Sequence, residues 1–358
     1  MRSASGDFDG NGLHDPLFRD SKGRVRDAPV MPAPVADTHA HLSMLGDPSW
    51  ALACCAVHHV DFVVAMVDPA EDVLTYGELD GWCEGARALL DAWDAAGWRA
   101  ADGRVLAEVK VPHVRIGIGV HPHNAKCYTT ACARRLVEYA ADPRTSFIGE
   151  IGLDYHYDLS PRDLQREVFA QQVQLAQGLG MPIALHLREA HDDALEVLAR
   201  TGIPEAGCVV HCFNLDADAL RPWLELGCHI ALGGPLTFRK SRALREAACL
   251  VPVDRLCTET DSPYMTPEPV RGTECGPAHT VFTAQRLCDV YLEAHPGLSD
   301  AQGFLQQLYD NALAFFDRPA CGWQGDDAHA AELVAHVQGC LSEEESARLS
   351  AELFLEER

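Results

Sequence analysis

The sequence has no apolar run long enough to cross a membrane, and basic residues are scarce for its length. A membrane helix needs about 18 or more consecutive apolar residues, and the 358 residues contain no such run. Lysine and arginine number 29 against 53 aspartate and glutamate residues, which gives a formal net charge of −24 at pH 7. Extended binding of a polyanion depends on basic residues that displace counterions. The composition therefore excludes a membrane helix and an extended nucleic-acid-binding groove, and leaves local cleavage of a nucleic acid open.

Signal-peptide features and paired cysteine motifs are also missing. The start, MRSASGDFDG, is polar and acidic and lacks the basic and apolar regions of a secretory signal, so we expect a cytoplasmic protein. The 14 cysteines favour reduced thiols over a disulfide framework, because a chain of this length can build a core without cross-links. Cys54 and Cys55 are adjacent, and Cys208 and Cys212 are four apart. Without a CxxC pair, the pattern argues against a zinc knuckle.

Short β-branched runs alternate with amphipathic helical stretches over residues 35–318, which is the pattern of parallel strands joined by crossover helices. Eight strand-like segments can be counted: VADTHAHL, VDFVVAMV, VRIGIGVHP, TSFIGEIGLD, PIALHLR, CVVHCF, HIALGG and RLCTETD. The sequence therefore predicts an α/β protein with a (β/α)8 TIM barrel. An open, doubly wound sheet is the alternative, and it would place the site at one switch point instead of a ring of strand ends.

Three segments lie outside a minimal barrel. We expect residues 1–34 to form an extended leader, because they are rich in Asp, Gly, Arg and Pro. Residues 71–110 are expected to be an inserted amphipathic helical segment before the third strand. Residues 319–358 are expected to form a C-terminal helical tail, since Ser342 and Glu345 make a capping-box pattern.

The leader contains a pattern that imitates a calcium site. In DFDGNG, Asp7, Asp9, Asn11 and Gly12 occupy the first positions of an EF-hand loop. The twelfth position, which should be a bidentate glutamate, is Phe18. We therefore interpret this segment as an acidic turn and not as a calcium site.

Six ligand-type residues point to a metal centre. His39 and His41 are two apart on the first predicted strand, so their side chains leave the same face. The other candidates each end a different predicted strand: Glu150, His186, His211 and Asp261. In a barrel these strand ends meet at one mouth. A single buried histidine is ordinary core structure, but burying four imidazoles and two carboxylates without a metal would leave polar groups short of partners.

The segments DTHAHL, GVHPH, IGEIGLDY, PIALHLR, VVHCF and DRLCTETDSPYMTP resemble the TatD family of metal-dependent deoxyribonucleases, a branch of the amidohydrolase superfamily. The resemblance spans residues 35–317. It implies a (β/α)8 fold and a metal-dependent, often 3′-to-5′ exonucleolytic, cleavage of phosphodiester bonds. It also implies one ion held by His39, His41, Glu150 and Asp261, and a second held by Glu150, His186 and His211, with Glu150 bridging the two.

Such a pair of ions suggests a mechanism. Two ions about 3.5–4 Å apart can share a water, lower its pKa and stabilise the attacking and leaving oxygens. Hydroxide would be the nucleophile. Glu150 and Asp261 are the catalytic candidates, and Asp261 would orient the water and accept its proton. Imidazole and carboxylate ligands together suit Zn, Mn or Mg.

Four further residues are candidates for substrate contacts. His121 and His123, in GVHPH, match the histidines on the phosphate side of the family's site, although both could be loop or packing residues. Arg188 lies two residues after a predicted ligand and is a candidate phosphate fork, with a surface ion pair as the alternative. Tyr264 could stack on a base or sugar, or serve as a packed lid residue.

Other charged residues near the predicted mouth allow two readings. Asp37 and Asp154 could orient ligands or could cap strand ends. The segment FRKSR places Arg239, Lys240 and Arg242 after the seventh strand, where barrels commonly bind phosphate, although charged helix surface is the commoner role.

The segment after DSPYMTP departs from the family pattern and leaves the substrate open. We would expect basic residues and an asparagine-glutamate-proline turn, but the chain reads EPVRGTECGPAHT, with Arg271 as its single basic residue. DNA or a small phosphoester is the expected substrate. An amidohydrolase acting on a small C–N or ester substrate is the alternative, and a non-catalytic interaction protein is a third hypothesis. The sequence gives no signal for an oligomeric state.

Overall fold

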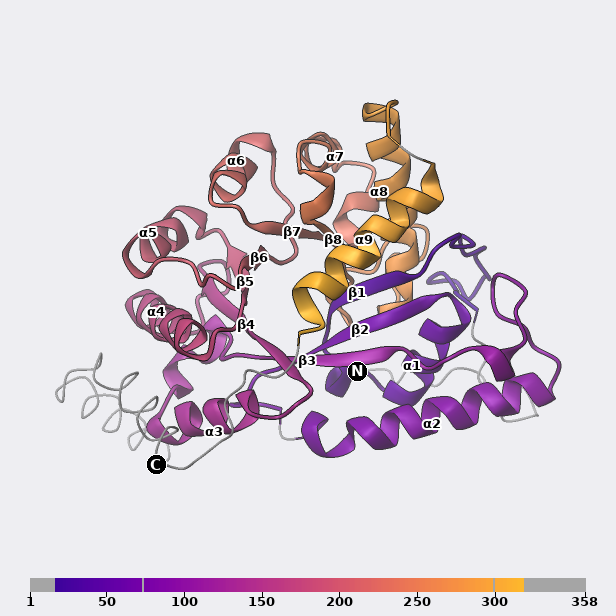
Figure 1. Ribbon diagram of the computed structural model, residues 1–358, viewed down its shortest axis with the longest axis horizontal. Coiled ribbons are helices and arrows are strands. Elements are labelled where there is room, and N and C mark those ends of the chain that lie inside the picture. The colour runs from indigo at the N-terminus through magenta and orange to yellow at the C-terminus, as the bar shows by residue number, and fades with distance from the viewer. Residues whose placement is uncertain (1–16, 73, 299, 319–358) are drawn as a thin grey trace. The chain divides into compact units, whose positions relative to one another are not determined.

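The computed structural model describes residues 17–72, 74–298 and 300–318, which divide into two compact units. The first unit is formed by residues 17–65, 74–115 and 212–316, and the second by residues 66–72, 116–211 and 317–318. In both units parallel strands alternate with helices along the chain, as the ribbon in Figure 1 shows. The strand order follows the chain order from β1 to β8.

The first unit carries two parallel strand pairs. Its strands are β1 (Val35–Ala40), β7 (His229–Leu232), β8 (Leu256–Thr258) and the starts of β2 (Val60–Val67) and β3 (His113–Ile118). Val35 pairs with Val60, and Ile230 pairs with Leu256. A parallel bridge between Ala40 and Ser262 joins the end of β1 to the chain that follows β8. The ends of β1 and β8 are therefore neighbours, as a parallel β/α arrangement requires.

Six α-helices cover the strands of the first unit: α1 (Pro48–Val57), α2 (Thr75–Ala95), α6 (Ala217–Glu225), α7 (Arg242–Ala248), α8 (Thr280–Ala294) and α9 (Ala301–Phe316). Helix α2 packs along α1 (Figure 1) and buries Leu90 and Trp93. At Gly85 a Cβ atom would collide with the Ser49 hydroxyl, so glycine permits this close approach. Within the segment predicted as an insertion, α2 is therefore the crossover helix between β2 and β3, and a short 3-10 helix (Leu106–Glu108) follows it.

Residues 17–34 are attached to the first unit through an aromatic contact and a charged turn. The buried Phe18 ring lies 4.5 Å from the His58 ring and 4.9 Å from the Phe282 ring, measured between centroids. Asp20 accepts hydrogen bonds from Arg24 and Arg26, which hold its pKa well below the ordinary value. Phe18, the residue that breaks the calcium-site pattern, is therefore a packing residue, while the rest of that pattern lies outside the described residues.

The second unit is a parallel sheet covered by helices. Its strands are β4 (Thr145–Asp154), β5 (Ile183–Arg188), β6 (Cys208–Val210) and the ends of β2 and β3. Its helices are α3 (Thr130–Ala140), α4 (Arg162–Leu179) and α5 (His191–Thr201). Every residue of β4 is buried, as expected for a parallel strand covered on both faces. Gly152 of β4 pairs with His186 of β5. This register places the candidate site residues of the two strands side by side.

Two expectations from composition can be compared with the described residues. No helix among them has the length and apolar character that a membrane crossing requires. The twelve cysteines within them are thiols and not disulfides. The capping-box residues Ser342 and Glu345 and the rest of the predicted C-terminal tail lie outside the described part of the chain.

Candidate functional site

Three predicted ligands meet in the first unit, where β1 and β8 end. The Asp261 amide donates a hydrogen bond of 2.9 Å to the His39 carbonyl, which fixes the two chain segments in register. Oδ1 of Asp261 lies 3.8 Å from Nε2 of His39 and 3.6 Å from Nε2 of His41. His39 is buried, and His41 and Asp261 are each 16% exposed at the side chain. We call His39, His41 and Asp261 the β1/β8 cluster.

A buried carboxylate, Asp37, braces the β1/β8 cluster through the backbone. Its Oδ1 accepts hydrogen bonds from the amides of His39, at 3.2 Å, and Thr260, at 2.8 Å. Its Oδ2 accepts a bond of 2.6 Å from the Thr260 hydroxyl. Burial raises the pKa of Asp37 well above its ordinary value, although these hydrogen bonds act in the opposite direction. Asp37 thus ties β1 to the segment after β8 and orients the His39 backbone.

In the second unit, strand alternation places two carboxylates on either side of one histidine. Glu150, Gly152 and Asp154 are each two residues apart on β4, so they share a face. Gly152 pairs with His186, and a Cβ atom at Gly152 would collide with the His186 carbonyl. The absence of a side chain therefore allows β5 to approach closely and puts the His186 ring between the carboxylates.

Glu150 is the centre of this second group. Its Oε2 lies 2.9 Å from Nδ1 of His186, 3.3 Å from Nε2 of His211 and 3.8 Å from Nε2 of His121. Ligand atoms of His121, Glu150 and His186 all lie within 4.8 Å of one another, an arrangement that can hold a metal ion. We call Glu150, His186, His211 and His121 the β4–β6 cluster.

Asp154 contacts a member of the β4–β6 cluster, His186, and also the neighbouring His123. Its Oδ2 lies 2.9 Å from Nε2 of His123 and 3.2 Å from Nε2 of His186. Its Oδ1 accepts hydrogen bonds from the backbone amides of His156 and Tyr157, each at 2.9 Å. Burial would raise the pKa of Asp154, but the hydrogen bonds from His123, His186 and Tyr157 outweigh burial and hold the pKa well below its ordinary value. One oxygen of Asp154 therefore contacts two imidazoles, and the other caps the end of the strand.

His186 is consequently bonded through both ring nitrogens. Burial lowers the pKa of this imidazole, but its hydrogen bonds to Asp154 and Glu150 raise it above the ordinary value overall. A carboxylate that bonds the second nitrogen of a ligating histidine fixes the tautomer and the ring orientation. Asp154 is in the position to do this for His186.

Two buried glutamines on α4, which the sequence reasoning did not single out, fix the loops that carry the β4–β6 cluster. The Gln165 side chain accepts a hydrogen bond of 2.9 Å from the Asp154 backbone amide and donates one of 3.2 Å to the Asp154 carbonyl. The Gln172 side chain accepts a hydrogen bond of 2.7 Å from the Val120 backbone amide and donates one of 3.0 Å to the Val120 carbonyl. Val120 directly precedes His121. The sequence signal was the spacing of seven between the glutamines, which places both on the buried helix face.

Asp68, directly after β2, is a third residue that sequence reasoning missed. Its Oδ2 accepts the His121 amide at 3.0 Å and the Asn124 side-chain amide at 2.9 Å. Burial raises the pKa of Asp68 to about 6, against the lowering effect of these bonds. Asp68 thus positions the loop that carries His121 and His123.

The predicted substrate contacts fall on both units. In the second unit, Arg188 places its guanidinium 4.6 Å from the centroid of the Tyr157 ring. The His123 ring lies 4.3 Å from the His121 ring. In the first unit, Tyr264 is 54% exposed, and its ring lies 6.4 Å from that of His41. The structure thus places His123 and Tyr264 beside residues of their own unit's cluster, and Arg188 two residues after His186.

The basic residues after β7 make contacts of their own. Arg242, highly exposed at the start of α7, pairs with Glu246 at 2.8 Å. Arg271 stacks on the Phe238 ring at 4.0 Å. The Arg239 carbonyl accepts a bond from Arg245. Arg242 therefore behaves as a charged helix surface residue of the first unit.

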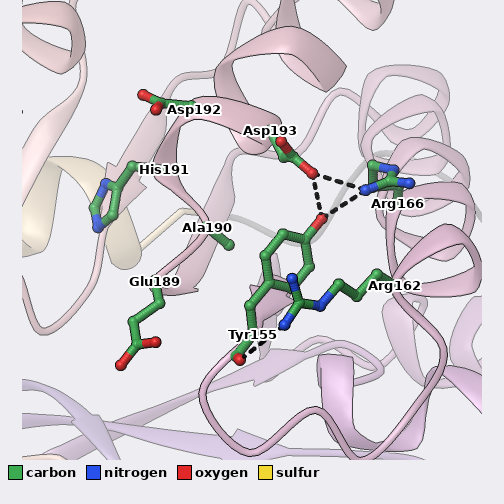
Figure 2. Close-up of a pocket in the computed structure, with 8 residues that line it drawn as sticks. All are labelled: Tyr155, Arg162, Arg166, Glu189, Ala190, His191, Asp192 and Asp193. Carbon is green, nitrogen blue, oxygen red and sulfur yellow. Dashed lines mark hydrogen bonds and ion pairs between the residues drawn. The ribbon is translucent and has the colours of Figure 1, made fainter.

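A cavity of about 460 Å³ lies on the second unit beside the ends of β4 and β5, and Figure 2 shows its lining. The Tyr155 hydroxyl donates to Asp193 at 2.6 Å and accepts from Arg166 at 2.9 Å, while Arg166 also pairs with Asp193 at 2.7 Å. Arg162 lies over the Tyr155 ring at 4.3 Å. Each arginine already has an acidic partner, so the cavity wall is a network that braces α4 against α5.

Comparison with known proteins identifies relatives for most of the chain. Residues 36–317 match the model of a family described as TatD related DNase. A Mycobacterium tuberculosis protein named uncharacterized metal-dependent hydrolase TatD is 32% identical over 268 residues, which cover 72% of this chain and 90% of that protein. A Pantoea vagans protein named 3′-5′ ssDNA/RNA exonuclease TatD is 40% identical over 154 residues, or 43% of this chain and 59% of that protein.

A solved structure supports the fold. The structure of YjjV, a TatD homologue from Escherichia coli K12, matches with a TM-score of 0.61 at 22% identity, covering 81% of this chain and 100% of that one. Eight parallel strands alternating with helices form a TIM barrel in this chain, so the predicted (β/α)8 fold is confirmed and the doubly wound alternative is excluded. The resemblance to the TatD family is confirmed as well, and with it the prediction of a metal-dependent hydrolase.

Proposed function

The chain belongs to the family of TatD-related DNases, and from this premise we propose that it cleaves phosphodiester bonds at the 3′ end of single-stranded nucleic acid with the help of two divalent ions. His39, His41 and Asp261 are the proposed ligands of one ion, and Glu150, His186 and His211 those of the other. The shared role of Glu150 that the resemblance implies stays a prediction.

One observation carries the proposal: a single carboxylate oxygen of Glu150 faces three imidazole nitrogens at 2.9 to 3.8 Å. Histidines gathered around a buried carboxylate are costly to desolvate unless they are bonded or bind a cation. The β1/β8 cluster repeats the same combination of imidazoles and a carboxylate. This set of nitrogen and oxygen donors suits Zn or Mn, and Mg remains possible through the carboxylates.

Divalent ions, when bound, lower the pKa of water and stabilise charge on the oxygens of a phosphoryl group. The protein's own residues perform the remaining tasks. Asp261, partly exposed at the end of β8, orients the attacking water and accepts its proton. Asp154 holds the ring of His186, and Asp37 holds the backbone of His39.

The substrate end is bound locally. A net charge of −24 opposes a long electrostatic footprint on a polyanion. His121, His123 and Arg188 are the proposed contacts to the scissile phosphate or its neighbour, and Tyr264 is a proposed stacking residue. The Pantoea vagans relative is named as a 3′-5′ exonuclease on ssDNA and RNA, which supports a single-stranded end as the substrate. The cytoplasmic location stays a prediction.

The test uses the purified full-length chain after removal of metal with a chelator. Release of mononucleotides from a 3′-labelled single-stranded oligonucleotide is measured with added Mn²⁺, Mg²⁺ or Zn²⁺, next to a panel of amide and carboxyl ester substrates. We expect metal-dependent nucleotide release and about two equivalents of bound metal by elemental analysis. Hydrolysis of the amide or ester substrates, with no nucleotide release under any metal, would contradict the proposal.

Single substitutions test the contribution of each cluster to nucleotide release separately. Glu150→Gln and Asp261→Asn each keep the size of the side chain but remove a charge, and each should lower nucleotide release by at least about 100-fold. Arg242→Ala serves as the matched control, because Arg242 pairs only with Glu246 among the contacts described for it and is highly exposed. Full activity of Glu150→Gln with unchanged metal content would overturn the assignment of that ligand.

A further inference from the structure

An exposed aromatic ring stands in the loop after β4, beside the β4–β6 cluster. Tyr157 is 55% exposed, although a ring of this size is usually buried to a large extent. Tyr155, two residues earlier, lines the cavity of Figure 2, where its hydroxyl is bonded to Asp193. The two tyrosines of this loop therefore have different tasks: Tyr155 braces the helices, and Tyr157 presents a surface.

The surroundings of Tyr157 hold its ring in place. The Arg188 guanidinium lies 4.6 Å from the ring centroid and covers one face. The His123 ring meets it edge-on at 5.4 Å and 90°, and the His156 ring does so at 5.0 Å and 82°. His156 is itself held by Glu189, whose Oε1 lies 2.8 Å from Nδ1 of that histidine. An exposed ring fixed from several sides loses little further entropy when a ligand packs on it.

The backbone fixes the ring relative to the metal-facing histidines as well. The Tyr157 amide donates to Oδ1 of Asp154, and Oδ2 of the same carboxylate lies 2.9 Å from His123 and 3.2 Å from His186. The same carboxylate therefore links the ring to the imidazole that faces Glu150. A group stacked on Tyr157 is consequently held at a fixed distance from the β4–β6 cluster.

We propose that Tyr157, backed by Arg188, is the platform on which an unpaired base of the substrate stacks, so that it selects base-bearing single-stranded ends. The inference rests on the proposed nuclease function and deepens it. A base has a flat π-face whatever its identity, so stacking tolerates any sequence. A paired base inside a duplex is already stacked on both sides and cannot use the platform.

The charge of the chain makes such a platform physically useful. Stacking adds affinity without relying on lysines and arginines, which this sequence has in short supply. The contribution of Tyr157 should therefore change little with salt concentration, unlike that of a phosphate contact. Because Arg188 occupies one face of the ring, the platform takes one base and not a sandwich of two.

The experiment compares two single-stranded oligonucleotides of equal length, one with normal residues and one whose last three 3′ residues are abasic. For the wild type we expect a kcat/KM about 10-fold or more higher on the base-bearing strand. Tyr157→Ala should lose this advantage, mainly through KM, and should lower kcat/KM on the abasic strand far less than on the base-bearing strand. Tyr157→Phe should keep the advantage, because the ring and not the hydroxyl does the stacking.

Leu159→Ala is the matched control, since Leu159 lies in the same loop and is 54% exposed but carries no ring. It should behave as the wild type on both strands. Equal losses on both strands in Tyr157→Ala would show that the residue only supports the fold, and an undiminished preference in that variant would overturn the platform directly.

A binding measurement keeps the two proposals distinguishable. Fluorescence anisotropy with phosphorothioate versions of both strands measures binding in the absence of cleavage, and stacking is given by the difference in affinity between the two strands. If the wild type cleaves and binds both strands equally well, the platform is wrong and the nuclease function stands. If it neither cleaves nor binds either strand, the proposed function fails and the platform fails with it.

Discussion

The two ligand clusters are held in place by different kinds of interaction. In the β1/β8 cluster the strand ends are tied by backbone bonds, such as the Asp261 amide to the His39 carbonyl and the His41 amide to the Ser262 carbonyl. Its carboxylate lies 3.6 and 3.8 Å from the two imidazoles, beyond hydrogen-bond distance. In the β4–β6 cluster, Glu150 and Asp154 make side-chain bonds of 2.9 to 3.2 Å to His186 and His123.

This difference indicates which substitutions should leave the geometry of each cluster intact. Backbone bonds persist when a side chain is changed, so the geometry of the β1/β8 cluster depends on the strand pairing itself. Side-chain networks lose their geometry when one member is removed, because the remaining buried groups are left without partners. The β4–β6 cluster should therefore be the more sensitive of the two to substitutions of residues that do not touch a metal ion.

The largest effect is expected from Asp154→Ala. This change leaves two imidazole nitrogens and two amides without their acceptor, so we expect the free energy of unfolding to fall by about 3–5 kcal/mol. Metal affinity or activity should fall by about 10- to 100-fold, as for other second partners of ligating histidines. Urea unfolding and elemental analysis measure the two effects.

The milder Asp154→Asn and Asp37→Asn form a matched pair, because each replaces a buried carboxylate that supports one cluster. The bonds of Asp37 go to two amides and the Thr260 hydroxyl, so Asp37→Asn should change metal affinity by less than about 3-fold while lowering stability. Equal losses of metal from both variants would contradict the view that the β4–β6 cluster depends more on side-chain bonds than the β1/β8 cluster does.

The next largest effect concerns acid stability and the first unit. His279 is half-buried with its ring 4.8 Å from the Phe18 ring, and desolvation, with the nearby His58, lowers its pKa from 6.5 to about 4. Below pH 6.5 His279 is protonated in the unfolded chain, whereas in the folded chain it stays neutral until the pH falls to about 4. The stability from this group is thus complete above pH 6.5, and about 3 kcal/mol is lost as the pH falls through this window.

Replacing His279 tests this directly. His279→Asn keeps an acceptor for the Gly276 amide, which His279 accepts at 2.9 Å, but it cannot take up a proton. The urea midpoint of the variant should vary less between pH 6.5 and pH 4 than that of the wild type. A pH dependence as steep as the wild type's would mean that His279 is not the group responsible.

The sequence was most informative where strand periodicity and residue type agree. Each of the eight predicted strands corresponds to a strand of the structure, and the spacing of His39 and His41 correctly placed both beside Asp261. For Asp154 the sequence left a ligand-orienting residue and a strand cap open: one oxygen caps the strand end, the other lies 3.2 Å from Nε2 of His186, and the orienting role stays a prediction.

The sequence was least informative for residues whose role depends on a distant partner. Gln165 and Gln172 look like ordinary helix polar residues, and only the packing of α4 against the loops shows that they bond backbone groups. Asp68 ends a strand as several aspartates do, but its partners lie more than fifty residues away. Such pairings depend on loop conformations, which helical or strand periodicity does not predict.

A moderate effect is expected from Gln172→Leu. The leucine keeps the volume but leaves the buried amide and carbonyl of Val120 without partners, so the free energy of unfolding should fall by about 2 kcal/mol. The loop that carries His121 should loosen, and hydrogen exchange at the Val120 amide should become faster. Urea unfolding and exchange measured by NMR give the two values.

The neighbouring Gln171 is the control for this change. Gln171 is also buried on α4, but within the described residues its side-chain oxygen has no hydrogen-bond partner and its side-chain nitrogen donates only a long bond of 3.3 Å to Glu167 of the same helix. Gln171→Leu should therefore leave the stability within about 0.5 kcal/mol of the wild type. Equal effects of the two leucines would mean that the bonds of Gln172 to Val120 do not hold the loop.

The smallest effect is expected from Tyr155→Phe, which separates the cavity of Figure 2 from the β4–β6 cluster. The change removes one hydroxyl bonded to Asp193 and Arg166 and should lower the free energy of unfolding by about 1 kcal/mol. Because Arg166 still pairs with Asp193, α4 and α5 stay joined, and nucleotide release should not change. A loss of activity as large as that of Asp154→Ala would instead make this cavity part of the reaction site, and Tyr155 would then do more than join α4 to α5.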